Sequence, residues 1–542
     1  MRVPGGRREQ LTRLSASPWW RGAAAVVAGA LPALAFPAPG LWWLAYVALV
    51  PWLLLVRAAP TGRRAALDGW LGGIGFMIAM HHWLVPNLHV FIVLLAALLG
   101  VLWAPWGWLV RRLLGGSPSA ARASAALVVV PSGWLVVELV RSWEALGGPW
   151  GLLGASQWQV PAALRVASVG GVWLVSLLVV AVNTAVAVLV SVPAARVPAT
   201  AGTVLCAVAV GSVWLWAPRP GRTDRVVRVA VVQPGVIDGV GGAERRFARG
   251  EQLTRELVGA RPDLVVWGES SVGADLSARP DLAARLAALS RAVGADVLVN
   301  VDARRKDRPG GQETRSGIYK SSVLVGPGGP TGDRYDKMRL VPFGEYVPAR
   351  ALLGWATSVG KAAGENRMRG DRQVVMSVPG GQGRPGLRVG PLVCFESAFP
   401  DMSRRLARDG ARLLVVQSAT STFQGSWAPA QHASLAALRA AETGRPTVHA
   451  TLTGVSAVYG PDGRPIGARL GTDESTAAVY EVPLTEGSTL YVRFGDWPVY
   501  GAVALLAALC AVCGVRYVRR PAPTPPAPPA RTTRGSAVRP GR

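Results

Sequence analysis

The chain has 542 residues, which leaves room for more than one domain, and half of its residues are hydrophobic. Much of its formal net charge of +26 comes from arginines at the ends of apolar segments, which is typical of membrane topology and not of a nucleic-acid-binding surface. No second cysteine lies near Cys394, and histidines and cysteines do not cluster, so we expect neither a disulfide nor a metal site there.

Apolar segments of membrane-crossing length follow an arginine-rich N-terminal tail, residues 1–21. Seven of them are predicted to form a membrane bundle over residues 22–217, and an eighth follows at residues 497–515. Each is about long enough to cross a hydrocarbon core of ~30 Å. The first seven lie near residues 22–38, 41–56, 66–85, 90–110, 124–140, 168–192 and 199–217.

The basic residues between these segments predict how the chain crosses the membrane. Every second connection carries arginines, beginning with Arg57, Arg63 and Arg64, whereas the others carry few or none. The arginine-rich connections belong in the cytoplasm, together with the N-terminus. Residues 218–496 are then expected on the outer face, and residues 516–542 are expected to form a disordered, basic and proline-rich cytoplasmic tail.

The connection between the fifth and sixth segments is rich in polar and aromatic residues, from Glu138 to Gln157. Glu138 and Arg141 lie three residues apart on one face of a helix end, where they could pair. One interpretation is an aromatic belt at the membrane interface with a single salt bridge. The other is the wall of a lipid-entry site beneath the outer region.

Residues 218–496 differ from the rest of the chain because they hold 28 of its 32 acidic residues. Strand and helix patterns alternate here, from a predicted strand at Val227–Val232 and a helix at Gly242–Gly259 to a last strand at Ala477–Val482. Regular alternation with short connections predicts a layered α/β domain.

Three segments of this region place reactive side chains where strands end or turn. Glu269 follows the predicted strand Leu264–Trp267, Cys394 follows another apolar strand, and Lys337 begins a turn-rich block that contains Glu345. Strand ends converge on one edge of a layered α/β fold, so a carboxylate, an ammonium and a thiol would meet there. The carboxylate would take the thiol proton, the thiolate would attack a carbonyl, and the ammonium would stabilise the oxyanion.

Each of these residues also has an ordinary structural interpretation. Taken alone, Cys394 could be a buried structural cysteine, Glu269 a surface acid and Lys337 a solvated cation. Lysine is rare in this arginine-rich chain, which makes each lysine informative. The four lysines are Lys306, Lys320, Lys337 and Lys361.

Taken together, the three segments resemble a known family. Trp267–Glu269, then Lys337, then Cys394–Glu396 resemble the Glu–Lys–Cys triad of the nitrilase, or carbon–nitrogen hydrolase, superfamily. The block Lys337–Pro348, with its LVPFGEYVP core, and the flanking apolar segments resemble one membrane-embedded branch, the apolipoprotein N-acyltransferase family. This resemblance implies a multi-span α-helical bundle of about eight spans that carries an α/β, nitrilase-like αββα sandwich.

The resemblance also implies a role for particular residues. Glu269 would be the general base, Lys337 the oxyanion stabiliser and Cys394 the nucleophile. The accessory or binding residues implied beside them are Glu345, Glu396, Phe395, Trp267 and Tyr346. No metal and no cofactor are implied.

The implied reaction is the N-acylation of lipoproteins in two steps. Cys394 would take an acyl chain from a membrane phospholipid as a thioester and pass it to the α-amine of the N-terminal S-diacylglyceryl cysteine of a lipoprotein. The implied partners are these two substrates and the lipid bilayer, without nucleic acid. The protein would be a monomer in the bacterial plasma membrane, with its catalytic region on the extracytoplasmic face and both termini in the cytoplasm.

The sequence departs from the family pattern around the triad. Gly268 stands where proline is common, and Phe395 stands where a tyrosine usually follows the cysteine. Thr451 and Thr453 stand where asparagines are usual, and residues 418–422 replace an Asn-Asp-Ala-Trp run. We expect these positions to affect the choice of phospholipid acyl donor and the rate of the reaction more than the type of reaction.

Two other functions remain open from the residues alone. A membrane-tethered amidase of the nitrilase type would resolve the same thioester with water. A non-catalytic lipid-binding or transport protein would carry ionisable residues inside its spans. The only acidic residues in the predicted spans are Asp68 and Glu138, both near span edges, which argues against transport.

Overall fold

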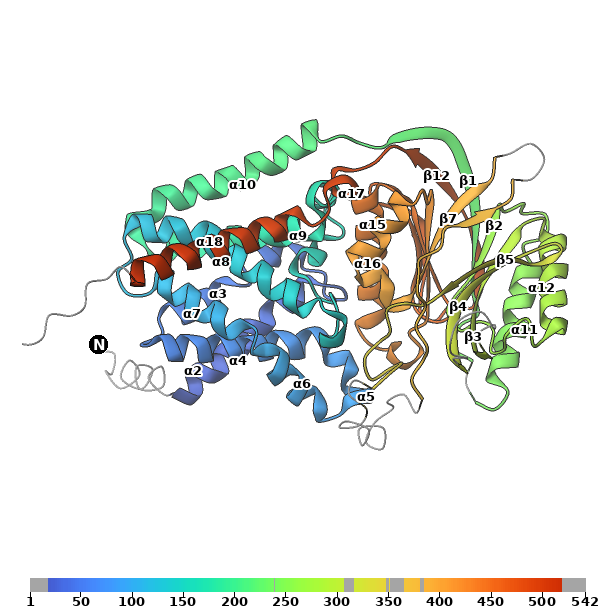
Figure 1. Ribbon diagram of the computed structural model, residues 1–542, viewed down its shortest axis with the longest axis horizontal. Coiled ribbons are helices and arrows are strands. Elements are labelled where there is room, and N and C mark those ends of the chain that lie inside the picture. Colours follow the sequence, from blue (N-terminus) through green and yellow to red (C-terminus); the bar gives the residue numbers. More distant parts are fainter. Residues whose placement is uncertain are drawn as a thin grey trace, which may run out of the picture.

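The computed structural model describes residues 18–237, 239–306, 316–347, 350, 365–380 and 385–518. The N-terminal helices and the last helix form a bundle at one end of the molecule, and two β-sheets with their own helices form the other end (Figure 1). The two predicted tails, residues 1–21 and 516–542, lie mostly outside the described residues.

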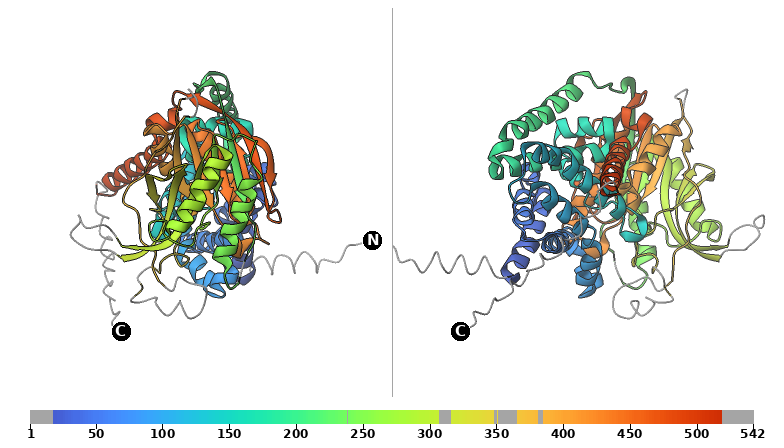
Figure 2. Two further views of the ribbon diagram at one scale, coloured as in Figure 1. Left: turned by 90° about the vertical axis from the view of Figure 1, so that its right-hand side faces the viewer. Right: turned by 60° about the vertical axis from the view of Figure 1, so that its left-hand side comes forward.

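The bundle contains the helices that precede the first strand and the last described helix of the chain. Their bounds are α2 (Pro18–Ala30), α3 (Val50–Arg57), α4 (Gly62–His81), α5 (Val85–Leu88), α6 (Phe91–Gly100), α7 (Trp103–Leu114), α8 (Ala120–Arg141), α9 (Pro161–Ser191), α10 (Arg196–Trp216) and α18 (Trp497–Val518). Short 3-10 turns join several of these helices. Helix α10 lies along the outside of the bundle (Figure 2) and buries a single side chain, that of Ala199.

Aromatic rings fill the centre of the bundle. Trp52, Trp103, Trp106 and Trp134 are each at most 2% exposed, and Phe76 packs among them. The four indole rings lie edge to face or tilted, with centroids 5.1–6.5 Å apart. Ring quadrupoles favour these arrangements over face-to-face stacking. Part of the chain's high tryptophan content therefore serves a packed helical core.

Four helices are long and apolar enough to cross a membrane: α8, α9, α10 with the turn before it, and α18. Helices α6 and α7 make a fifth crossing if the pair, bent by 42°, counts as one span. The predicted segments near residues 22–38 and 41–56 form helices that are shorter than expected. The segment near residues 66–85 forms the 20-residue helix α4, which carries charged side chains. Within the described residues, length and composition thus support four or five crossings and not clearly the eight that the sequence predicted.

The other end of the molecule contains two six-stranded sheets within the described residues. The first has the order β12-β1-β2-β3-β4-β5 and the second the order β11-β10-β9-β8-β7-β6. The strands of the first are β1 (Gly221–Gln233), β2 (Leu264–Trp267), β3 (Asp296–Lys306), β4 (Ser316–Gly326), β5 (Gly329–Asp336) and β12 (Thr476–Glu486). Those of the second are β6 (Met376–Val378), β7 (Leu387–Val393), β8 (Leu413–Ser418), β9 (Thr447–Thr451), β10 (Ser456–Tyr459) and β11 (Pro465–Leu470).

The centre of each sheet is parallel and its margins are antiparallel. Strands β1, β2 and β3 are parallel to one another, and so are β7, β8 and β9. Parallel strands are covered on both faces, and accordingly every residue of β2, β8 and β9 is buried. Their carboxyl ends lie at one edge, where polar side chains can be collected.

Helices cover the outer faces of the paired sheets. Helices α11 (Gly242–Arg255) and α12 (Pro280–Val293) lie on the first sheet, while α15 (Pro400–Arg408) and α16 (Ala428–Thr443) lie between the second sheet and the bundle (Figure 1). The layers therefore run helix, sheet, sheet, helix, as the αββα expectation requires. Helix α16 also packs against α9, so its two faces join the sheets to the bundle.

Candidate active site

The end of β2 in the first sheet meets the end of β8 in the second. Glu269, which follows β2, donates its backbone N–H to the carbonyl oxygen of Ser418 at 3.1 Å. The buried amide of Gln417 donates to the carbonyl oxygen of Trp267 at 2.8 Å and accepts from the hydroxyl of Ser322 on β4 at 2.5 Å. These hydrogen bonds tie the two sheets together at the edge from which Glu269 projects.

Gly268 permits this close approach of the two sheets. A Cβ atom on Gly268 would lie 1.9 Å from the amide nitrogen of Leu452 and 2.4 Å from the carbonyl carbon of Thr451. The amide of Leu452 donates to the carbonyl oxygen of Ser418 at 2.8 Å, so this backbone is itself held in place. Two of the departures from the family pattern, Gly268 and Thr451, therefore lie against each other.

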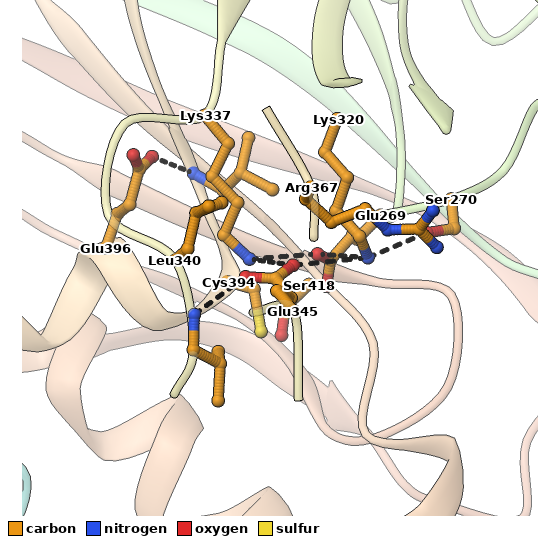
Figure 3. Close-up of polar contacts among 12 residues, drawn as sticks. Glu269, Ser270, Lys320, Lys337, Leu340, Glu345, Arg367, Cys394, Glu396 and Ser418 are labelled. Carbon is orange, nitrogen blue, oxygen red and sulfur yellow. Dashed lines mark hydrogen bonds and ion pairs between the residues drawn. The ribbon is translucent and has the colours of Figure 1, made fainter. Parts of the chain in front are cut away.

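Lys337 follows β5, and its side chain is 1% exposed. Its backbone N–H donates to the carbonyl oxygen of Lys320 on β4 at 2.8 Å. Its Nζ lies 3.2 Å from Oε1 of Glu269 and 2.8 Å from Oε1 of Glu345 (Figure 3). The other oxygen of Glu345 accepts the backbone N–H of Val341 at 2.8 Å. A tight turn thus folds the second carboxylate back over the lysine.

Cys394 stands where β7 passes into a 3-10 helix, η7 (Cys394–Ala398). Its φ of 51° lies in the left-handed region, which is uncommon for a residue other than glycine. The carbonyl oxygen of Cys394 accepts hydrogen bonds from Nε2 of His432 and from the hydroxyl of Ser397, both at 3.0 Å. Strained backbone that is held by its neighbours is often found at functional sites.

Glu396 fixes the backbone around the site. Its Oε1 accepts from the hydroxyl of Tyr335 at 2.7 Å and from the backbone N–H groups of Met338 and Arg339 at 2.7 and 3.1 Å. Its Oε2 accepts from the backbone N–H of Val393 at 2.8 Å. The carboxylate therefore joins the strand before the thiol to the segment after Lys337.

Opposing charges set the protonation states of the cluster. Burial alone would raise the pKa of Glu269, but the ammonium groups of Lys320 and Lys337 outweigh it and lower that pKa to about 2. Burial, reinforced by the charge of Glu269, raises the pKa of the Cys394 thiol to about 12. The thiol and the Glu269 carboxylate each shift the pKa of the other, because they lie close together in the cluster. At neutral pH the site holds a neutral thiol beside a carboxylate that can take its proton during an attack.

Lys320 is a functional candidate that the sequence did not connect to this cluster. Its Nζ lies 2.9 Å from Oε1 of Glu269 and 3.2 Å from the hydroxyl of Ser270. The contact joins residues 51 positions apart in the chain. The available signal was the scarcity of lysine, which marked Lys320 for attention without indicating a partner.

Three predicted accessory residues make their main contacts outside the charged cluster. Trp267 is fully buried in the core, where its ring packs against that of Phe247 at 5.6 Å. Phe395 packs edge to face on Phe399 at 5.0 Å. Tyr346 is half-buried beneath an arginine guanidinium. Glu345, in contrast, belongs to the cluster itself.

The connection between α8 and α9 reaches this region from the bundle. Nε1 of Trp150 donates to Oε1 of Gln431 on α16 at 2.9 Å. Oε1 of Glu144 accepts the backbone N–H of Leu340, within the block that begins at Lys337, at 3.0 Å. The bundle therefore touches the elements that carry the site.

Glu138 and Arg141 order this connection and do not form the predicted salt bridge with each other. Glu138 Oε1 accepts the backbone N–H of Leu153 at 2.7 Å, and Arg141 Nη1 donates to the carbonyl oxygen of Trp150 at 2.6 Å. Both side chains are about 1% exposed. The connection is therefore an ordered element that reaches the site, and its role as the wall of a lipid-entry site stays a prediction.

A thiol, a carboxylate and an ammonium in contact supply a nucleophile, a base and an oxyanion partner. These three groups are the ones required for acyl transfer or for hydrolysis of a carboxylic acid derivative. Among the residues that the structure describes, no group of three or more His, Cys, Asp or Glu side chains could hold a metal ion.

Two family models match the chain. Residues 28–185 match the apolipoprotein N-acyltransferase N-terminal domain, and residues 228–489 match carbon–nitrogen hydrolase. The second match spans both sheets and the whole charged cluster. The paired sheets therefore form a nitrilase-like fold, and the resemblance stated from the sequence is confirmed.

Relatives match over most of the chain. An apolipoprotein N-acyltransferase from Geobacter metallireducens is 30% identical over 511 residues, which covers 89% of this chain and 94% of the relative. One from Azotobacter vinelandii is 31% identical over 514 residues, with coverage of 90% and 94%. Among solved structures, an amidase from Nesterenkonia sp. matches 52% of this chain and 97% of its own, with 20% identity and a TM-score of 0.33.

The contact at Gly268 generates a testable prediction. Gly268→Ala forces a methyl group into the backbone of Leu452, and overpacking of this kind costs about 1–3 kcal/mol of stability. We expect a lower Tm in detergent solution than for the unchanged protein. Gly211→Ala on α10 is the matched control, because no atom lies within 4 Å of a Cβ at that position. Equal Tm values for the two variants would contradict the proposed close contact.

Proposed function

Because the chain belongs to the apolipoprotein N-acyltransferase family, we propose that it moves a phospholipid acyl chain, by way of a thioester on Cys394, to the N-terminal α-amine of lipoproteins. The acceptor is the S-diacylglyceryl cysteine at the lipoprotein's N-terminus. The observation that carries this proposal is the buried cluster in which Lys337 binds the carboxylates of Glu269 and Glu345, with the Cys394 thiol close enough to share their electrostatic field. Glu269 acts as the general base, Lys337 as the oxyanion stabiliser and Cys394 as the nucleophile.

The first step forms the thioester. Glu269 takes the thiol proton while Sγ of Cys394 attacks the ester carbonyl of the phospholipid. Lys337 stabilises the oxyanion that develops on the carbonyl oxygen. Collapse of this intermediate breaks the ester C–O bond, and the leaving alkoxide takes the proton from Glu269. A lysophospholipid departs and the acyl chain stays on sulfur.

The second step uses the same groups in the same order. The neutral α-amine of the lipoprotein attacks the thioester carbonyl, and Glu269 takes one proton from its nitrogen. Collapse breaks the C–S bond and forms the amide. The departing thiolate takes the proton from Glu269, which restores the thiol. The low pKa of Glu269 keeps its carboxylate ionised at the start of each step.

Exclusion of water favours the amine over hydrolysis. Cys394 is partly buried and packs against the hydrophobic core that runs from the bundle into the second sheet. A thioester in such a place is shielded from bulk water, whereas the apolar side chains around it would pack favourably against a lipid acyl chain. The contact of the bundle with the site elements gives substrates anchored in a bilayer a direct approach.

The proposed placement in the membrane follows the charge pattern. Residues 22–217 and 497–515 would form an eight-span bundle in the bacterial plasma membrane, with the short helices α2 to α4 completing crossings that they are too short or too polar to make alone. Residues 218–496 would lie on the extracytoplasmic face and both termini in the cytoplasm. The protein would act as a monomer, because the cluster is complete within one chain and the proposed chemistry needs no group from a second copy.

The amidase alternative shares the first step and differs in how the thioester is resolved. The match of residues 28–185 to the acyltransferase N-terminal domain favours the amine as acceptor over water. The carrier alternative predicts no covalent step. Detection of an acyl adduct separates it from both enzymes.

The nucleophile can be tested by intact mass after incubation with phospholipid. We expect the protein to gain one acyl chain, and Cys394→Ala to gain none and to form no N-acylated lipoprotein. The control variants are Cys206→Ala, Cys510→Ala and Cys513→Ala, on helices α10 and α18, which should acylate as the unchanged protein does. An adduct in Cys394→Ala, or its absence in the unchanged protein, would contradict the mechanism.

A second test addresses Lys337. Loss of one oxyanion donor typically costs roughly 10²–10³ in rate. Arginine keeps the charge, but its larger planar group places its donors differently and does not fit a side chain that is 1% exposed between two carboxylates. We expect Lys337→Arg to form the acyl-enzyme nearly as slowly as Lys337→Ala. Arg339→Lys, at a position 33% exposed, should be tolerated far better. Acylation of Lys337→Arg at a near-normal rate would show that only local charge matters.

The orientation can be tested with a reporter fused after Arg222, where the chain enters β1. Seven crossings before this point place it outside, so a reporter that is active only after export should be active. A cytoplasmic reporter at the same position should be silent. The opposite result would show that the number of crossings before β1 is even.

A further inference from the structure

The proposed mechanism assigns no role to the second ammonium group of the candidate site, that of Lys320. Lys320 on β4 is 13% exposed, and its Nζ binds Oε1 of Glu269 at 2.9 Å and the hydroxyl of Ser270 at 3.2 Å. The carboxylates of Glu345 and Asp302 lie 3.6 and 3.7 Å from the same nitrogen. Figure 3 shows Lys320 and Lys337 approaching Glu269 from two sides. Three carboxylates thus surround one lysine.

Lys320 balances the buried charges of the cluster. Glu269 and Glu345 bring two negative charges, and Lys337 and Lys320 bring two positive ones. Both ammonium groups bind the same oxygen of Glu269. Without Lys320, a single ammonium would face two buried carboxylates. A buried carboxylate that lacks compensation tends to take up a proton.

The groups around Glu269 come from several elements. Lys320 on β4, Lys337 after β5, Cys394 on η7 and His432 on α16 act on its charge. His432 is neutral at neutral pH because burial lowers its pKa to about 4. Beyond them lie Glu345, Asp302 and Arg367, the last 3.5 Å from Asp302. Lys320 is thus one of two cations in direct contact with the carboxylate.

We propose that Lys320 is a positioning residue that keeps the Glu269 carboxylate ionised and directed at the Cys394 thiol, so that the charge of Lys337 is available to the oxyanion. The proposal rests on the proposed function, in which Glu269 is the base. It assigns the two lysines different tasks, with Lys320 acting through Glu269 and Lys337 acting on the reacting carbonyl. The attraction of Lys320 also helps to hold the pKa of Glu269 low against the effect of burial.

The hydrogen bonds of Lys320 agree with this division of tasks. The Ser270 hydroxyl, which accepts from Lys320, also donates to Asp302 at 3.2 Å. The Ser270 backbone N–H donates to Asn300 on β3 at 2.9 Å. Lys320 is therefore anchored to the first sheet beside Glu269, whereas Lys337 is anchored to the turn that carries Glu345.

The test compares four variants of the full-length protein in detergent between pH 4 and pH 8. Lys320→Met removes the charge, Lys320→Gln removes it but keeps a hydrogen-bond donor, and Lys320→Arg keeps it. Arg285→Met is the control, because it removes a cation that pairs with Glu251 on the outer helices. Two rates are measured for each variant: alkylation of Cys394 by iodoacetamide, followed on the Cys394 peptide by mass spectrometry, and acyl-enzyme formation with phospholipid.

Each variant's rate is divided by that of the unchanged protein at the same pH. Removing the cation should raise the pKa of Glu269 by roughly one to three pH units, so protonation begins within the measured range. We expect the ratios for Lys320→Met and Lys320→Gln to fall several-fold as the pH is lowered from 7 to 4. The ratio for Lys320→Arg should stay much closer to constant, and that for Arg285→Met should not change with pH.

A loss of rate that is the same at every pH would overturn the proposal, because a merely structural defect has no reason to follow the ionisation of Glu269. Unchanged rates at every pH would overturn it as well. If Lys320→Met does not fold, Lys320→Gln gives the same comparison. The alkylation rate needs no phospholipid, so absence of an acyl adduct on the unchanged protein would contradict the proposed function while the effect of Lys320 on Cys394 is still decided.

Discussion

A carboxylate held away from water stays ionised only where positive groups compensate its charge. Glu269 is 3% exposed, and two ammonium groups bind one of its oxygens. This constraint explains why two of the chain's four lysines meet at one point. It also explains the resting state, in which the thiol keeps its proton and the carboxylate does not. In the proposed mechanism, chemistry begins only when a carbonyl group arrives for the sulfur to attack.

Two buried polar side chains, Glu396 of the same turn and His432 of α16, hold the backbone around Cys394. Glu396 binds the N–H groups of Val393 and Met338, and so sets the distance between the thiol and the block that carries Lys337. His432 binds the carbonyl oxygen of Cys394 through Nε2 and contacts the Ser418 hydroxyl through Nδ1. The left-handed conformation of the nucleophile is thus held by contacts that do not involve the thiol itself, which leaves sulfur free to react.

The joint between the bundle and the sheets is built on a broken helix. Helix α9 is broken at Gly170 and Gly171, and the N–H of Val172, freed by the break, donates to Glu442 on α16 at 2.8 Å. Glu442 also forms a buried ion pair with Arg439 at 3.0 Å. Burial raises the pKa of Glu442 to about 7 although Arg439 opposes this effect. The ion pair lies within α16 and holds the Glu442 side chain in place, while its hydrogen bond with Val172 joins the second sheet's helix to the bundle.

The sequence by itself determined the family and many of the elements. Apolar runs predicted β2 and the strand before Cys394, and helix α11 begins at the predicted Gly242 but ends at Arg255, before the predicted Gly259. The short strands β5, β6 and β11 were not predicted, because they are partly exposed and carry no long apolar run. The number of crossings was also not settled, because helices α2 to α4 depend on packing against the rest of the bundle.

Only the tertiary structure decided how the reactive groups are charged and held. Hydrophobic periodicity records which face of one element is buried, but it does not record which strands become neighbours. The contact of Lys320 with Glu269 depends on the order of the strands in the first sheet, and the need for glycine at position 268 depends on how closely the second sheet approaches. Glu396 shows the same limit, because its place beside the nucleophile in the chain did not indicate that it binds backbone amides.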